Sequence, residues 1–217
     1  MSPSKSRRRR PRKKKSNNTK LILVVVVVLV AVAVIIVAYN MLGSNGSSEE
    51  PLPSSNKVLF ETTMGNILIE LRDDMPITVN NFKKLVHEGV YDNTIFHRVV
   101  NLPDNLVIVQ GGDPSTNEEW SGGTIPNIQD EFSENPENNK NIKGTIAMAN
   151  KGPEYPNSGS SQFFINGEYN DHLDNKHPVF GDIIDGLTVV DDILNVETNS
   201  NSQPLEDVIL IKARFVD

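Results

Sequence analysis

Phe96-His97-Arg98 is followed along the chain by Gln110-Gly111-Gly112-Asp113 and then by Ser161-Gln162-Phe163-Phe164. Each stretch carries little information alone, because a strand arginine is usually solvated and a Gly-Gly pair usually makes a tight turn. Their occurrence together, in this order, is the strongest functional signal in the 217-residue chain.

The sequence around these stretches is rich in short β-forming segments. Val58–Thr62 and Ile67–Leu71 are apolar, alternating runs on either side of Met64-Gly65-Asn66, which predicts a β-hairpin. Other apolar runs are bounded by Gly, Asn or Pro and also predict strands: Thr94–Val99, Leu106–Gln110, Thr145–Ala149, Gln162–Ile165, Val179–Ile183 and Val208–Phe215.

Two segments have helical spacing of apolar residues instead. Pro76 suits the first turn of a helix that continues to about Glu88 and ends at Gly89. A second helix is predicted over Leu187–Leu194. Many short strands, two helices and polar loops predict a mostly β, antiparallel barrel or sandwich, and periodicity does not distinguish the two.

The motifs resemble those of the cyclophilin-type peptidyl-prolyl cis-trans isomerases. The resemblance extends over residues 57–217 and includes the opening hairpin and the helix at Pro76. It implies a mostly β, cyclophilin-like fold, an eight-stranded antiparallel barrel closed by two helices, with a substrate groove on its outer face. The matching motifs are Phe96-His97-Arg98-Val99-Val100, Gln110-Gly111-Gly112-Asp113-Pro114, Met148-Ala149-Asn150-Lys151-Gly152-Pro153, Gly159-Ser160-Ser161-Gln162-Phe163-Phe164-Ile165 and Leu173-Asp174-Asn175-Lys176-His177-Pro178-Val179-Phe180-Gly181.

The implied reaction needs neither a nucleophile nor a metal. Rotation about an X-Pro bond has a barrier of about 18–20 kcal/mol, because resonance gives the C–N bond double-bond character. Catalysis needs an apolar socket for the proline ring, hydrogen-bond donors for the adjoining carbonyl and a cation that disfavours amide resonance. A guanidinium suits the last task, because it is permanently charged and its donors are planar and fixed.

The resemblance implies a role for each residue of the site. Arg98 is expected to polarise the amide nitrogen, and Gln162 to orient Arg98 and the substrate. Phe164 and Leu173 are expected to form the proline socket, and the Asn150 backbone to pair with the substrate. The catalytic residues are expected to be Arg98, Gln162, Phe164 and His177. The substrate-binding residues are expected to be His97, Val107, Ile108, Gln110, Ala149, Asn150, Lys151, His172 and Leu173, although His97 also suits packing within the fold.

Three positions depart from the family pattern. Counting back from Gln110, Val107 stands where the family usually has a socket phenylalanine, after an insertion at Asn101–Asn105. A wider socket would weaken proline binding, by about 1–2 kcal/mol. His172 replaces the tryptophan of animal cyclophilins, which makes cyclosporin sensitivity doubtful. Lys151 replaces a small residue, which favours acidic residues before the proline.

The N-terminal part of the chain predicts a membrane anchor. Residues 21–42 carry no charge and are long enough to cross a bilayer, and no small-x-small cleavage site follows them. All ten Lys and Arg of the first 20 residues precede this run, so the N-terminus is expected in the cytoplasm. The predicted organisation is a basic cytoplasmic tail (1–20), a transmembrane signal anchor (21–42), a flexible linker (43–56) and an extracytoplasmic isomerase domain (57–217).

The amino-acid composition limits the kinds of partner and cofactor that the chain is expected to bind. After residue 20 the chain has 11 basic and 28 acidic residues, which disfavours nucleic-acid binding. The chain has no cysteine, and its histidine spacing does not suggest a metal site, so no metal or cofactor is expected. The sequence therefore predicts a single-pass, monomeric membrane protein that isomerises proline-containing polypeptides during export. The alternative is a proline-peptide binding module or holdase with weak catalysis.

Overall fold

The computed structural model describes residues 51–217. The predicted basic tail, membrane anchor and most of the linker lie outside these residues. Within residues 51–217, the structure contains no helix that is long and apolar enough to span a bilayer.

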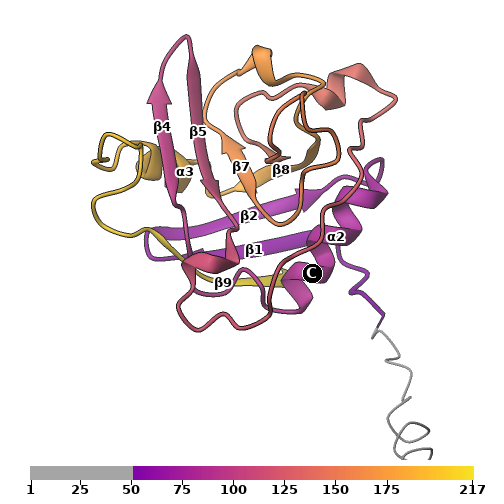
Figure 1. Cartoon of the computed structure of the whole chain (residues 1–217), viewed down its shortest axis with the longest axis horizontal. Coiled ribbons are helices and arrows are strands. Elements are labelled where there is room, and N and C mark those ends of the chain that lie inside the picture. Colours follow the sequence, from indigo (N-terminus) through magenta and orange to yellow (C-terminus); the bar gives the residue numbers. More distant parts are fainter. Residues whose placement is uncertain (1–50) are drawn as a thin grey trace, which may run out of the picture. The chain divides into compact units, whose positions relative to one another are not determined.

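One curled antiparallel sheet makes up most of this region (Figure 1). Within residues 51–217 it has nine strands, in the order β3-β9-β1-β2-β8-β6-β7-β5-β4. The strands are β1 (Lys57–Thr62), β2 (Gly65–Leu71), β3 (Thr94–Ile95), β4 (Arg98–Leu102), β5 (Leu106–Gly111), β6 (Thr145–Met148), β7 (Phe163–Asn166), β8 (Val179–Asp185) and β9 (Ile209–Val216).

The first hairpin forms as its sequence predicts. Alternate residues of β1, including Val58 and Phe60, are buried, and their partners in β2 are Ile69 and Ile67. The connecting turn is stabilised by Thr62, whose Oγ1 accepts from Met64 N at 3.1 Å and donates to Gly65 O at 2.7 Å. Period-two burial therefore gives the register directly.

Two α-helices lie in the described region, and both confirm the sequence prediction. α2 (Pro76–His87) starts with proline, and Gly89 follows its end at φ +69°. The Glu131 carboxylate accepts from Ile77 N at 3.1 Å and Thr78 N at 2.9 Å, so a distant loop caps this N-terminus. α3 (Leu187–Leu194) follows Gly186, which has a left-handed conformation.

The predicted strand Thr94–Val99 is in fact two strands. β3 pairs with β9 and β4 pairs with β5, so the chain changes partners at Phe96-His97. Phe96 N donates to Val208 O at 2.9 Å, and the Phe96 ring is buried in the core. Within residues 51–217 the edge strands β3 and β4 do not pair with each other, so the sheet is a curled half-barrel instead of the predicted eight-stranded barrel.

The insertion at Asn101–Asn105 lengthens a hairpin. β4 continues to Leu102, which pairs with Leu106 at the start of β5. The turn contains Pro103 and Asp104, and Asp104 has φ +65°, a conformation that Asp tolerates better than most residues. Figure 1 shows the β4–β5 hairpin projecting beyond its neighbours.

The main core lies on the inner face of the sheet and is rich in aromatic rings. Phe82 of α2 has its ring centroid 5.0 Å from that of Phe180 and 5.2 Å from that of Tyr91. Phe163 of β7 lies 5.3 Å from Phe60 of β1. Burial of such side chains stabilises the fold by about 1.5–3 kcal/mol each.

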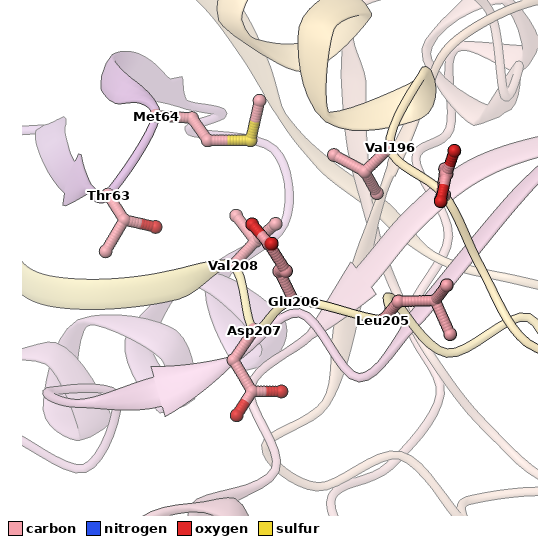
Figure 2. A pocket seen from close by; sticks show the side chains of 8 residues that line it. Thr63, Met64, Val196, Leu205, Glu206, Asp207 and Val208 are labelled. Carbon is pink, nitrogen blue, oxygen red and sulfur yellow. The ribbon is translucent and has the colours of Figure 1, made fainter.

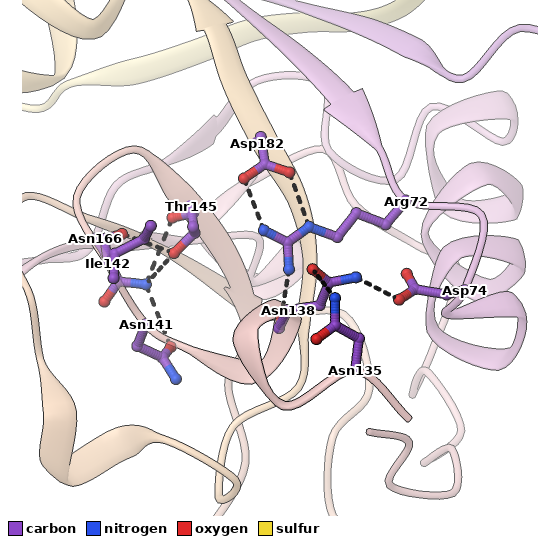
Figure 3. Close-up of polar contacts among 9 residues, drawn as sticks. All are labelled: Arg72, Asp74, Asn135, Asn138, Asn141, Ile142, Thr145, Asn166 and Asp182. Atoms are coloured by element: carbon purple, nitrogen blue, oxygen red, sulfur yellow. Dashed lines mark hydrogen bonds and ion pairs between the residues drawn. The ribbon is translucent and has the colours of Figure 1, made fainter. Parts of the chain in front are cut away.

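Hydrogen bonds attach the loop around Asn138 to the sheet (Figure 3). Arg72, at the end of β2, makes two hydrogen bonds to the Asp182 carboxylate, at 2.8 and 2.7 Å. It also donates to Asn138 O, in the 3₁₀ turn Pro136–Asn139. Asn138 Nδ2 donates to Asp74 Oδ2 at 2.7 Å, and so this loop is attached at two points.

The last residues of the predicted linker are also attached to the domain. Asn56 O accepts from Leu71 N at 2.8 Å. Lys83 Nζ donates to Asn56 Oδ1 at 2.6 Å and to Pro53 O at 3.5 Å. Only 8% of Lys83 is exposed, so these neutral acceptors stabilise a buried ammonium.

Candidate functional site

One register row crosses the outer face of the sheet and aligns the expected functional residues. Arg98 of β4 lies opposite Gln110 of β5, which lies opposite Phe164 of β7. Phe164 in turn faces Ala147 of β6, whose partner is Val179 of β8. Antiparallel pairing therefore brings a cation, an amide and an aromatic ring together from separate parts of the sequence.

Apolar residues around Phe164 form a second cluster, distinct from the main core. We call this cluster the outer socket. Its position follows from strand alternation, since neighbouring residues on each strand point to opposite faces. Its buried members are Val100, Ile108, Ala147, Phe164 and Val179, and Leu106, Ala149 and Leu173 pack against them.

A chain of side-chain hydrogen bonds holds Arg98 beside the outer socket. Arg98 Nη1 donates to Gln110 Oε1 at 3.2 Å, and Gln110 Nε2 donates to Gln162 Oε1 at 3.1 Å. Gln162 Nε2 donates to Asp113 Oδ2 at 2.9 Å. Within residues 51–217, Arg98 makes no ion pair, so most of its five donors remain for a ligand.

His177 closes one side of the socket. Its ring packs edge-on to Phe164, with centroids 5.3 Å apart and an interplanar angle of 78°. Nδ1 lies 3.2 Å from Met148 O, and a carbonyl only accepts, so Nδ1 carries the hydrogen. Burial lowers the pKa of His177 below 6.5, and the bond to Met148 offsets only part of this effect. The ring is therefore a neutral wall at pH 7.

His97 lies next to Arg98, where β3 gives way to β4. Its Nδ1 is buried and has no hydrogen-bond partner within residues 51–217. Burial lowers the pKa of His97, while the nearby Asp113 charge raises it and Arg98 lowers it further.

The site thus contains a guanidinium without a carboxylate partner, an apolar socket and neutral imidazoles. This arrangement can hold a small apolar ring and donate hydrogen bonds to a neighbouring carbonyl.

Comparison with known proteins identifies the family. The sequence profile "Cyclophilin type peptidyl-prolyl cis-trans isomerase/CLD" matches residues 57–215. The chain belongs to the cyclophilin family. Cyclophilin-type relatives carry the name of the enzyme, and this chain is a peptidyl-prolyl cis-trans isomerase of that type.

The curated relatives consist almost entirely of the matched region. "Peptidyl-prolyl cis-trans isomerase-like 1" of Gibberella zeae is 38% identical over 164 residues, which are 75% of this chain and 96% of the relative. "Peptidyl-prolyl cis-trans isomerase ppi1" of Schizosaccharomyces pombe is 40% identical over 159 residues, 72% of this chain and 96% of the relative.

A solved structure shows the same fold. The cyclophilin-type isomerase of Cryptosporidium parvum, crystallised in the presence of the dipeptide Ala-Pro, has a TM-score of 0.65 at 28% identity. The similarity covers 74% of this chain and 99% of the Cryptosporidium chain. A cyclophilin fold with the signature motifs is therefore established, while the role of each side chain rests on the geometry.

The structure corrects the position of Val107. This residue, 3% exposed, belongs to the main core, whereas its neighbours Leu106 and Ile108 contact the outer socket. Counting back from Gln110 placed Val107 beside Phe164, but odd and even positions of β5 point to opposite faces. Val107 therefore packs in the main core and is not a member of the outer socket, contrary to the position that we predicted for it.

Of the other predicted substrate-binding residues, Ile108 is a buried member of the outer socket, and Ala149 and Leu173 pack against it. Ala149 N donates to Gln162 O at 3.0 Å, and Asn150 Nδ2 donates to Lys176 O at 2.8 Å, which ties the loop carrying His177 to the end of β6. Lys151 is exposed in the following loop. His172 is also exposed, in the 3₁₀ turn Asp171–Leu173.

Sequence reasoning missed several members of the socket in this cyclophilin. Val100, Ala147 and Val179 contribute to the cluster, and Asp113 ends the hydrogen-bond chain. The alternation Arg98-Val99-Val100 was a usable signal for Val100, because Val100 shares a face with Arg98. Ala147 and Val179 needed the register across the sheet, which no local pattern contains.

Another hollow lies away from these residues. It has a volume of about 770 Å³ and lies between the β1–β2 turn and the segment before β9. Figure 2 shows Met64, Leu205 and acidic side chains around it. It contains none of the motif residues, so its size does not make it the isomerase site. Across residues 51–217, no group of three His, Asp or Glu side chains is arranged to hold a metal.

Proposed function

We propose that this cyclophilin isomerises X-Pro bonds in exported or membrane-surface polypeptides. The supporting observation is the Arg98 guanidinium, which lies in register with Phe164 without a carboxylate partner. The substrate proline occupies the outer socket against Phe164, Leu173 and His177. The reaction makes and breaks no covalent bond, so positioning and electrostatics supply the catalysis.

In this mechanism Arg98 stabilises the twisted amide. Its free N–H groups donate to the proline carbonyl and polarise the ring nitrogen as that nitrogen becomes pyramidal. Loss of resonance lowers the barrier of about 18–20 kcal/mol. Gln110 and Gln162 hold the guanidinium in place before the substrate arrives, so little reorganisation is needed during rotation.

We also propose that this enzyme acts at the outer face of the cytoplasmic membrane. Residues 21–42 are proposed to anchor the chain in the cytoplasmic membrane, with the basic tail inside and the isomerase domain outside. An isomerase held at this position meets polypeptides as they emerge from the membrane. The domain is proposed to act as a monomer.

The alternative is a binding module or holdase without useful catalysis. Its main support was the missing phenylalanine at Val107, and that residue lies in the main core. Leu106 and Ile108 supply apolar walls on the correct face. No described contact now favours the alternative, and a rate measurement separates it from the enzyme.

The decisive experiment is the cis-to-trans rate of a short Ala-Pro peptide with residues 51–217. This fragment is suitable because the relatives consist almost entirely of the matched region. We expect Arg98→Ala to reduce kcat/KM more than tenfold, with an unchanged melting temperature because Arg98 is half-buried on the outer face. Arg98→Lys keeps the charge but loses the planar donors, and should recover only part of the rate.

Two results would contradict the proposal. Unchanged turnover in Arg98→Ala would remove Arg98 from the mechanism. No acceleration by the folded wild-type fragment would indicate a proline-peptide binding module.

A further inference from the structure

The hydrogen-bond chain that starts at Arg98 ends at Asp113, and the two end groups have fixed roles. A guanidinium only donates, and a carboxylate only accepts. Gln162 therefore turns Nε2 toward Asp113 and Oε1 toward Gln110. Gln110 in turn presents Oε1 to Arg98 Nη1, at 3.2 Å. Each amide thus has a single orientation that satisfies both of its neighbours.

The Asp113 carboxylate is itself held by the turn that follows it. Asp113 is the N-cap of the 3₁₀ turn Pro114–Thr116, and its Oδ1 accepts from Ser115 N at 3.0 Å and from Ser115 Oγ at 2.7 Å. Thr116 Oγ1 donates to Asp113 O at 2.7 Å and accepts from Ile95 N at 3.1 Å, which attaches the turn to β3. These contacts leave Oδ2 to face the glutamine, so the two carboxylate oxygens have separate partners.

The glycine before Asp113 allows this turn to approach β7. Gly112 has φ +78°, a conformation that favours glycine. A Cβ at this position would lie 2.7 Å from Phe163 Cδ1 and 2.8 Å from Ser161 O. A larger residue would push the turn away from β7, and with it Asp113 from Gln162. The Gly-Gly-Asp motif therefore has a role in the site, which is to bring a carboxylate to the end of the hydrogen-bond chain.

This arrangement differs from a direct ion pair. In the part of the chain that the structure describes, Arg98 has no carboxylate within salt-bridge distance. A direct bidentate carboxylate would occupy donors that the substrate carbonyl needs. Two interposed amides instead hold the guanidinium through one N–H group and leave the others for the substrate.

We infer that Asp113 is a positioning residue for the isomerase reaction, and that it acts on Arg98 through Gln162 and Gln110. This inference rests on the proposed function, in which Arg98 stabilises the twisted amide, and adds the group that fixes the direction of the guanidinium. Because the hydrogen-bond chain is complete before the substrate binds, the orientation of Arg98 costs little during the reaction.

Asp113→Asn tests this role with almost no change in volume. Asn has one acceptor oxygen where two are needed. If that oxygen caps Ser115 N, the new amide N–H₂ meets Gln162 Nε2 and the hydrogen-bond chain is interrupted. With residues 51–217, we expect kcat/KM for a short Ala-Pro peptide to fall about 3–10-fold, because the guanidinium keeps its charge but is less well oriented. The melting temperature should be unchanged, since Asn and Asp are equally good N-caps.

Dependence on Arg98 separates positioning from a general structural effect. In the Arg98→Ala background, Asp113→Asn should cause no further loss of kcat/KM, because no guanidinium remains to be oriented. A structural effect would lower the rate by the same factor in both backgrounds. The control is Asn135→Ala, which removes the N-cap of the 3₁₀ turn Pro136–Asn139 in another loop and should leave the rate unchanged.

A second double variant moves the carboxylate one step along the hydrogen-bond chain. Gln162→Glu alone places two carboxylates together and should lower kcat/KM. When it is combined with Asp113→Asn, the new carboxylate accepts from the new amide and from Gln110 Nε2, so every donor again has an acceptor. We expect the double variant to exceed Gln162→Glu alone by about threefold in kcat/KM, as coupled neighbours do.

Each outcome bears on one of the two claims. Unchanged kcat/KM in Asp113→Asn, or the same loss with and without Arg98, would overturn the positioning role and leave the isomerase intact. A double variant that is no faster than Gln162→Glu would also overturn it. No acceleration by the folded wild-type fragment would refute the proposed function and, with it, this inference.

Discussion

Val107 shows how a shift of one position changes the meaning of a residue. It stands three residues before Gln110, as the socket phenylalanine of the family does, yet it is buried in the main core. A Cβ added at Gly167 would lie 2.7 Å from Val107 Cγ1, so the surroundings are already tightly packed. The residues that complete the socket are its neighbours Leu106 and Ile108.

Val107→Phe is therefore expected to destabilise the fold instead of improving catalysis. Overpacking of a filled core typically costs about 1–3 kcal/mol. The urea midpoint of residues 51–217 should fall, without a change in the slope of the transition. Leu106→Phe is the matched control, since Leu106 is half-buried on the outer face and should keep its midpoint. An equal loss in both variants would contradict this placement.

The two half-buried histidines predict a pH dependence of stability. Burial lowers the pKa of both His97 and His177 below 6.5 in the folded protein. Between the folded and unfolded pKa values the unfolded state binds more protons, so stability rises with pH in that window. The free energy of unfolding should thus fall as the pH drops from 7 through 6.5 and below.

Urea unfolding at a series of pH values measures this dependence. His97→Gln combined with His177→Gln should flatten the decline below pH 7, because both titrating groups are removed. His172→Gln, at an exposed position, is the control and should retain the wild-type profile. An unchanged decline in the double variant would assign the pH dependence to other groups.

At the scale of elements, helix α2 and the segment before β1 stabilise each other through hydrogen bonds. The predicted flexible linker includes Pro53 and Asn56, yet both accept hydrogen bonds from the buried Lys83 ammonium of α2. The sequence shows a lysine on a helix and a Pro/Ser-rich stretch. Only the folded chain shows that they meet, because their contact depends on where β1 places Asn56.

Asn56→Ala should therefore destabilise residues 51–217 by about 1–3 kcal/mol, since it leaves a buried ammonium with too few acceptors. Lys83→Met removes the charge and keeps the aliphatic volume, so it should cost less than Asn56→Ala. Combining Asn56→Ala with Lys83→Met should recover part of the loss. Thermal melts of the three variants and wild type would show this order, and a larger loss in Lys83→Met would contradict it.

The break between strands β3 and β4 at Phe96-His97 is also decided at the level of secondary-structure elements. The sequence from Thr94 to Val99 is uniformly suited to a strand, and local propensity predicts one. The chain instead leaves β9 and joins β5, since the Phe96 ring fills the core and Arg98 must reach the outer face. Tertiary packing overrides propensity here, as it often does in β-structure.

At the scale of the whole molecule, charge is strongly segregated. Residues 51–217 contain 11 basic and 26 acidic side chains, whereas the first 20 residues contain ten basic and none acidic. The apolar run at 21–42 separates the two regions. This distribution is the basis of the proposed orientation, because positive segments remain on the cytoplasmic side.

The full chain is thus expected in the membrane fraction, with its isomerase domain accessible from outside. Proteinase K added to intact spheroplasts should digest the domain and leave a small protected N-terminal piece. Residues 51–217 expressed alone should be found outside the membrane fraction and keep the Ala-Pro activity of the full chain. Recovery of the full chain without membrane, or protection of its domain, would contradict the proposed location.

The amino-acid sequence was enough to predict the family, both α-helices and the first hairpin, and to select Arg98, Gln162, Phe164 and His177 as candidate site residues. These conclusions depend on local periodicity and ordered motifs, which are properties of neighbouring residues. Only the folded chain shows which residues share the outer face, where β3 ends, and how Asn101–Asn105 prolongs a hairpin. Those features depend on core packing and on strand register. A shift of one residue in the register of a strand turns every side chain of that strand to the opposite face of the sheet.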